Sequence, residues 1–159
     1  MMKGSEDVST KNDKLTGDYR VCVNEADAFL SVAKSCVRSI EDFLGGKMYP
    51  FAVNVSFACE LYLKALMIRR SSASEFVRGH DLKSLFESLS PEDRDAIRKM
   101  YGKKSGVSLD QLLEESGKAF EDWRYALEKA ASINVTGILA FANVLQDYVK
   151  KTGENAGGS

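Results

Sequence analysis

The chain has few of the residues from which metal sites and disulfide frameworks are made. It contains one histidine, His80, and three cysteines, Cys22, Cys36 and Cys59. The cysteines are odd in number and widely spaced, which argues against paired disulfides and against a zinc site. We expect them to be small buried hydrophobic side chains in a reducing cytosol. No two His or Cys residues stand at the spacing of metal ligands, so we expect neither a metal nor a cofactor.

Two motifs of common enzyme classes are also absent. Gly45-Gly46 is not followed by Lys-Ser or Lys-Thr at the spacing of a phosphate-binding loop, which excludes a nucleotide fold of that type. The sequence contains no nucleophile elbow. Because His80 is the only histidine, any imidazole acid-base chemistry within one chain must use it.

An excess of charge of either sign is absent too. The chain has 22 Lys and Arg residues against 23 Asp and Glu residues, for a net charge of -1. It therefore has no global attraction to nucleic-acid phosphates or anionic membranes, and binding of nucleic acid would need a local patch. Residues 1–17 lack the apolar core of a signal peptide, and the most apolar helix is interrupted by Glu60 and Lys64. We expect a soluble cytoplasmic protein that does not enter a membrane.

Helical periodicity is the main positive signal in the sequence. With only two prolines, 44% hydrophobic and 28% charged residues, the composition is typical of a soluble helical domain. On a helix over residues 51–70, apolar side chains cover most of the circumference, so we expect this helix to be surrounded by other helices. The exception is a narrow polar stripe of Ser56, Glu60 and Lys64, in which Glu60 and Lys64 can pair along the helix.

The other expected helices pack around this central one. The first covers residues 19–44, places Ile40 and Leu44 on its inner face and ends at Gly45-Gly46. Four further helices begin at cap residues: a short one after His80 or Asp81, one after Ser90, one over residues 108–128 after Ser108, and one after Asn134. We predict an all-α antiparallel bundle of four to five helices with one or two short accessory helices. It spans residues 18–151, between a disordered segment 1–17 and a flexible tail 152–159.

Several polar residues have both a structural and a functional interpretation. His80, beside Asp81, either braces the short helix through local hydrogen bonds or carries chemistry. Glu60 and Lys64 form either a simple pair within one helix or part of a network between helices.

The triplet Trp123-Arg124-Tyr125 places an arginine between two aromatic residues, an arrangement that can stack on bases or clamp a phosphate. In the structural interpretation, Trp123 belongs to the core and Arg124 pairs with Glu60 or Glu128. Both interpretations stay open.

Three motifs in order resemble the HEPN family, the higher eukaryote and prokaryote nucleotide-binding domain. They are ELYLKAL at 60–66, GHDL at 79–82, and FEDWRY at 120–125 followed by Glu128. The resemblance implies a bundle of four or five helices that usually dimerises. It also implies involvement in nucleotide or RNA biology, often in prokaryotic defence or toxin systems beside a nucleotidyltransferase.

Many members of that family are metal-independent ribonucleases in which an Arg and a His, separated by four to six residues, meet at the dimer interface. Carried over, the arginine is Arg124, but Lys129, Ala130 and Ala131 stand where the histidine would be. The absence of this histidine favours a non-catalytic binding or interaction module. The alternatives are a weak endoribonuclease that uses Arg124 and His80, and a purely structural or assembly protein.

The first and last helices carry apolar residues beyond a single stripe. These residues are Val21, Val32 and Phe43 in the first helix, and Val135, Phe141 and Val144 in the last. Because a monomer rarely leaves a large apolar patch in water, the pattern predicts a two-fold homodimer built from long helices.

Overall fold

The computed structural model of the chain describes residues 19–70, 79–116 and 134–156. Every regular element in these ranges is a helix, which confirms the all-α class. The expected disordered segment 1–17 and the motif at 120–128, with Trp123, Arg124, Tyr125 and Glu128, lie outside the described residues.

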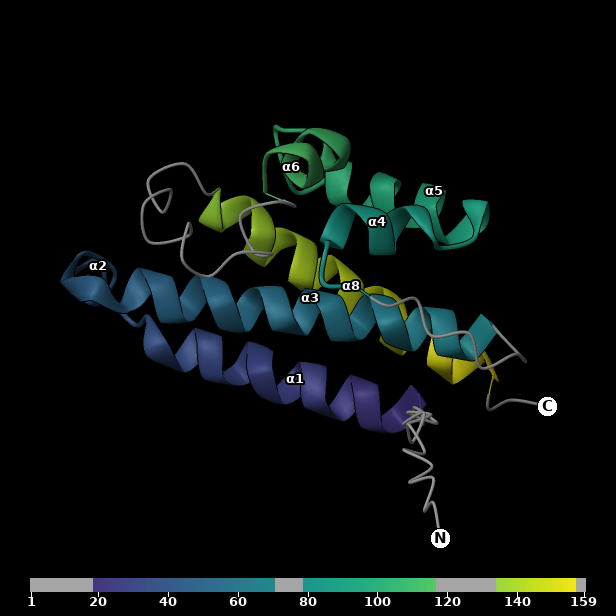
Figure 1. Cartoon of the computed structure of the whole chain (residues 1–159), viewed down its shortest axis with the longest axis horizontal. Helices are drawn as coiled ribbons and strands as arrows, with labels where there is room; N and C mark the ends of the chain where they lie inside the picture. Colours follow the sequence, from purple (N-terminus) through teal and green to yellow (C-terminus); the bar gives the residue numbers. More distant parts are fainter. Residues whose placement is uncertain (1–18, 71–78, 117–133, 157–159) are drawn as a thin grey trace, which may run out of the picture.

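A helical hairpin opens the fold. Helix α1, Tyr19–Cys36, is followed by the short elements α2, Ile40–Asp42, and η1, Phe43–Lys47, and then by α3, Met48–Arg70. The chain reverses at Gly46, whose φ of +94° lies in the left-handed region that glycine adopts without strain. The predicted reversal at Gly45-Gly46 is thus confirmed, and α1 and α3 lie side by side in opposite directions (Figure 1).

The first helix is shorter than the periodicity predicts. It ends at Cys36, because Asp42 accepts a hydrogen bond from the Arg38 backbone N–H at 3.1 Å and the Ser39 hydroxyl accepts one from the Asp42 backbone at 3.2 Å. Such local side-chain bonds compete with the helical pattern. The placement of Ile40 and Leu44 on the inner face is therefore wrong: they are 76% and 81% exposed.

Helix α3 is the centre of the molecule. It contacts α1, the short helix α4, Leu82–Glu87, and the last helix α8, Val135–Ala156. Its side chains between Phe51 and Leu66 are buried almost all round, as its composition predicts. The stretch Leu44–Arg70 is long and apolar enough to cross a membrane by length and composition alone, but most of it is buried inside the protein, as is usual for the core helix of a soluble protein.

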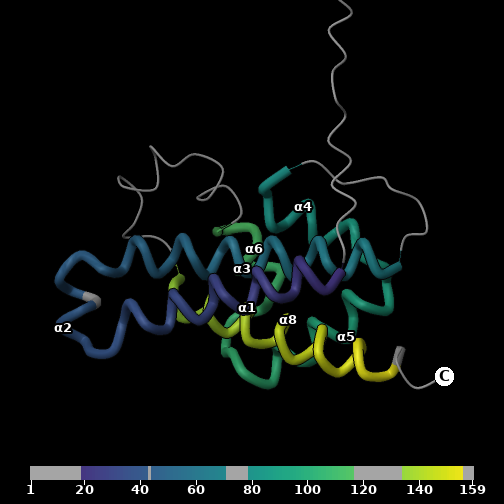
Figure 2. Tube along the Cα trace, turned by 90° about the horizontal axis from the view of Figure 1, so that it is seen from below, coloured from purple at the N-terminus to yellow at the C-terminus, as the bar shows by residue number. Residues whose placement is uncertain are grey.

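Helix α8 runs parallel to α3 and antiparallel to α1, as Figures 1 and 2 both show. It extends to Ala156, so residues 152–156 of the expected flexible tail are helical. The Thr152 hydroxyl donates a hydrogen bond to the Tyr148 carbonyl at 2.7 Å, and Gly153 lies against the hydroxyl of Tyr19. Packing against the start of α1 therefore holds the final turn, despite its glycine.

Helices α4, α5, Pro91–Gly102, and α6, Leu109–Ser116, cover the side of α3 and α8 that is opposite α1 (Figure 1). The predicted caps are confirmed: side-chain oxygens of four residues accept backbone N–H groups in the first turn of the helix that follows. These residues are Asp81, Ser90, Ser108 and Asn134.

The core surrounds α3 and has contributions from α1, α4, α5, α6 and α8. It includes Phe141 of α8, whose ring meets Phe86 and Tyr101 edge to face. Phe141 and Val144 are fully buried, so they are not part of a surface patch, contrary to the expectation for the last helix. Val21 and Val32 on α1 are about half exposed, at 51% and 50%. Of the cysteines, Cys59 is buried and its thiol pKa is raised by burial, whereas Cys22 and Cys36 are only half-buried.

Candidate functional site

A buried carboxylate on α3 joins the first two family-like motifs. Glu60 is 8% exposed, and its Oε1 lies 2.5 Å from the Lys64 Nζ one turn later. The Nδ1 atom of His80 lies 3.0 Å from the same oxygen and 3.2 Å from Oε2. We call Glu60, Lys64 and His80 the α3 polar cluster.

The position of His80 follows from how α4 begins. Asp81 caps α4 by accepting the backbone N–H groups of Lys83 and Ser84, so the cap leaves the preceding His80 outside the helix. Because α4 packs against α3, the His80 ring reaches across to Glu60. Asp81 thus caps this helix, and the His80 ring contacts Glu60 of another element instead of its own helix.

The network interpretation of Glu60 and Lys64 is confirmed, with a partner that local spacing does not indicate. Lys64 is the partner along the helix and His80 is the partner between helices, whereas Arg124 lies outside the described residues. Ser56, the third residue of the stripe, instead donates to the Ala52 carbonyl of its own helix at 2.8 Å.

The exposures within the cluster differ sharply. The side chains of Glu60 and Lys64 are 10% and 15% exposed, but that of His80 is 71% exposed. With Nδ1 directed at the carboxylate, Nε2 is the ring nitrogen that a ligand can reach. A histidine oriented by a carboxylate in this way can bind a ligand or move a proton.

A second buried carboxylate, Asp93 in the first turn of α5, was not identified as a network residue from the sequence. The side chain is 1% exposed; it accepts a hydrogen bond from the Tyr148 hydroxyl at 2.5 Å and forms an ion pair with Arg70 at 2.8 Å. Burial raises the pKa of Asp93, but the bonds from Tyr148, Arg70 and Ser90 outweigh it and hold the pKa below its usual 3.8. Burial and the neighbouring carboxylate raise the pKa of Tyr148 to about 12.

A third polar contact joins the three long helices of the described ranges. The Tyr62 hydroxyl on α3 donates to the Asp27 carboxylate on α1, and the Gln146 amide on α8 donates to the same oxygen at 2.8 Å. Burial, together with the hydrogen bond to Asp27, raises the pKa of Tyr62. Because the Tyr62 hydroxyl is enclosed in this way, we assign it a structural role. The only indication of the contact in the sequence is a tyrosine on an otherwise apolar helix face.

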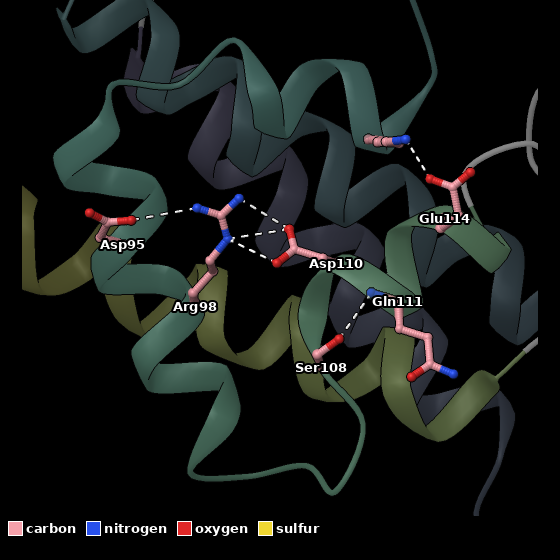
Figure 3. Close-up of polar contacts among 7 residues, drawn as sticks. Asp95, Arg98, Ser108, Asp110, Gln111 and Glu114 are labelled. Carbon is pink, nitrogen blue, oxygen red and sulfur yellow. Dashed lines mark hydrogen bonds and ion pairs between the residues drawn. The ribbon is translucent and has the colours of Figure 1, made fainter.

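The short helices are tied together by exposed ion pairs (Figure 3). The Arg98 guanidinium on α5 contacts the Asp110 carboxylate on α6 through Nε and Nη2, at 3.1 to 3.3 Å, and also lies near Asp95. The Arg98 Cζ atom also lies over the ring of Phe86 of α4, 5.3 Å from the ring centroid. Lys83 and Glu114 form a similar pair between α4 and α6. These groups satisfy one another, so this cluster has a structural role.

Within the described ranges, no three His, Cys, Asp or Glu side chains gather closely enough to hold a metal ion. Comparisons with protein-family models, with curated proteins and with solved structures find no match to this chain. The resemblance to the HEPN family therefore depends on the three sequence motifs.

Proposed function

We propose that the chain is a HEPN-like helical binding and interaction module linked to nucleotide or RNA biology, of the defence or toxin-antitoxin type. It acts as a cytoplasmic homodimer without catalytic activity of its own. The observation that supports it best is the α3 polar cluster: Glu60 and Lys64 from the first motif hold the exposed imidazole of His80 from the second.

Burial and exposure explain why this cluster suits binding. Keeping a carboxylate 90% covered is costly unless its lone pairs are satisfied, and here Lys64 and His80 satisfy them. A surface histidine that binds no ligand does not need a buried carboxylate to orient its ring. The arrangement instead presents one oriented ring nitrogen at the surface, which is how binding sites fix a polar contact.

The test is binding of fluorescently labelled single-stranded RNA at low salt, where electrostatic contacts are strongest. We expect the wild type to bind, and His80→Ala to bind about tenfold more weakly. Lys83→Ala is the matched control, because Lys83 is a cation of the adjacent helix that pairs with Glu114 outside the cluster. Absence of binding at low salt would favour the structural or assembly alternative.

The same His80–Glu60 contact favours a second candidate, a metal-independent endoribonuclease. A general base is oriented by a carboxylate in this manner, and Arg124 would supply the phosphate contact. RNA cleavage in the presence of a chelator that is lost in both Arg124→Ala and His80→Ala would establish the enzyme and overturn the non-catalytic proposal. RNA binding without cleavage would support the binding module.

A nucleotidyltransferase is the proposed protein partner, on the family resemblance alone. Co-expression of the chain with the product of the adjacent gene tests this proposal. A stable complex with a nucleotidyltransferase is the expected result, and an unrelated neighbour that does not bind would contradict it.

A further inference from the structure

The donors around Glu60 determine which nitrogen of the neutral His80 ring carries the proton. The Lys64 ammonium has only donors, and it lies 2.5 Å from Glu60 Oε1, so Glu60 is an ionised carboxylate that only accepts. The Nδ1 atom of His80, 3.0 and 3.2 Å from the two oxygens, must then be the donor. In the neutral ring this leaves Nε2 with a lone pair and no proton.

An exposed acceptor nitrogen can accept a hydrogen bond from a base N–H group, which RNA and DNA share, or from the ribose 2′-hydroxyl, which only RNA has. A phosphate oxygen cannot donate to Nε2, whereas the ribose 2′-hydroxyl can, and that hydroxyl is the group by which proteins distinguish RNA from DNA. The cluster also has little attraction for phosphate when His80 is neutral, because the charge of Lys64 is balanced by that of Glu60.

We propose that Glu60 is a positioning residue that keeps Nε2 of neutral His80 as an acceptor for a ribose 2′-hydroxyl, so that the site selects RNA over DNA. The inference depends on the proposed function, since it names the group of the nucleic acid that this site recognises. His80 makes the contact, and Glu60 acts through it.

The tautomer can be measured without any ligand. Because His80 is the only histidine, the ¹⁵N NMR signals of the imidazole belong to it alone. In alkaline buffer, where these signals show a neutral ring, we expect the proton on Nδ1. In Glu60→Gln, the single amide oxygen faces the Lys64 ammonium and the amide NH₂ faces Nδ1, so the proton moves to Nε2. A wild-type ring protonated on Nε2 would overturn the inference.

Binding gives the second readout, with three oligonucleotides of one sequence: RNA, DNA and 2′-O-methyl RNA. In the same buffer we expect the wild type to bind RNA about tenfold more tightly than the other two, because 2′-O-methylation removes the donor and keeps the oxygen. The preference over both should fall to about one in His80→Ala and persist in Lys83→Ala. In Glu60→Gln, Nε2 carries a proton and can donate to the 2′-oxygen that RNA and 2′-O-methyl RNA share, so the preference over 2′-O-methyl RNA should be lost while that over DNA remains. If Glu60→Gln does not fold, His80→Ala carries the test, since that side chain is 71% exposed.

The outcomes separate the two proposals. Equal binding of all three oligonucleotides by the wild type overturns the inference about the 2′-hydroxyl and leaves the binding function standing. Binding of none of them overturns the proposed function, and the inference with it.

Discussion

At the scale of single residues, the buried carboxylates distinguish this bundle from an ordinary hydrophobic one. Glu60→Ala removes the acceptor of Lys64 and leaves an ammonium that is only 15% exposed without its counter-charge. We expect a loss of about 3 kcal/mol in the free energy of unfolding. Glu92→Ala is the control, because Glu92 is 83% exposed and its pair with Arg70 contributes less than about 1 kcal/mol. Thermal melts that show equal small shifts would mean that Glu60 is merely solvated.

Asp93 makes the stability of the fold sensitive to acid. Its pKa is lower in the folded chain than its usual 3.8, so the unfolded chain binds more protons as the pH falls towards and below that value. The contribution of Asp93 is therefore complete above the unfolded pKa and is lost as the pH falls through the folded pKa. We expect urea midpoints of Asp93→Asn to be lower than those of the wild type near neutral pH, and to decline less steeply in acid. Parallel pH profiles would contradict this account.

At the scale of elements, the hairpin between α1 and α3 depends on one backbone conformation. Neither Gly45 nor Gly46 has an atom within 4 Å of an added Cβ, so space does not distinguish them. Only Gly46, at φ +94°, has a conformation that alanine avoids, whereas Gly45 lies at φ −80°. We expect Gly46→Ala to cost about 1 kcal/mol, and Gly45→Ala to be stabilising by about 0.5 kcal/mol. Denaturant unfolding of both variants measures the difference, and equal effects would contradict it.

Helix α8 illustrates a different use of glycine. A Cβ on Gly137 would lie 2.7 Å from Leu112 Cδ1 and 2.9 Å from Asn134 Cγ, so the absence of a side chain permits close packing of α8 against α6. The cap residue Asn134 and this contact together position the start of α8. Its position in turn sets which α8 side chains reach Asp27 and Asp93.

At the scale of the whole molecule, the proposed homodimer needs an apolar surface. Of the residues expected on that surface, Phe141 and Val144 of α8 are buried and Val135 is partly buried against the core. The side chain of Phe43 lies outside what the structure describes. Val21 and Val32 remain half exposed on α1. They are eleven residues apart, which places them on one face of the helix. We expect sedimentation equilibrium to show a dimer, and Val32→Asp to weaken it. A single species near the 17.5 kDa chain mass at micromolar concentration would contradict the prediction.

The sequence by itself determined the helical class, the buried central helix and most helix starts. These features depend on local interactions: Ser90 and Asp81 cap the turns that follow them directly, and the apolar circumference of α3 requires neighbours whatever their direction. The polar stripe likewise indicated that Glu60 needed a cationic partner, and Lys64 one turn later is that partner.

Only the tertiary structure decided which distant groups meet. His80 lies 20 residues from Glu60, and Tyr148 lies 55 residues from Asp93; both contacts depend on how helices pack, which no local spacing specifies. The final turn of α8 was likewise set by a contact with the distant Tyr19. The end of α1 at Cys36, in contrast, depends on the local bonds of Ser39 and Asp42, which periodicity alone does not reveal. The energies of such contacts come from burial and complementary charge in three dimensions, whereas periodicity records only which side of a helix is apolar.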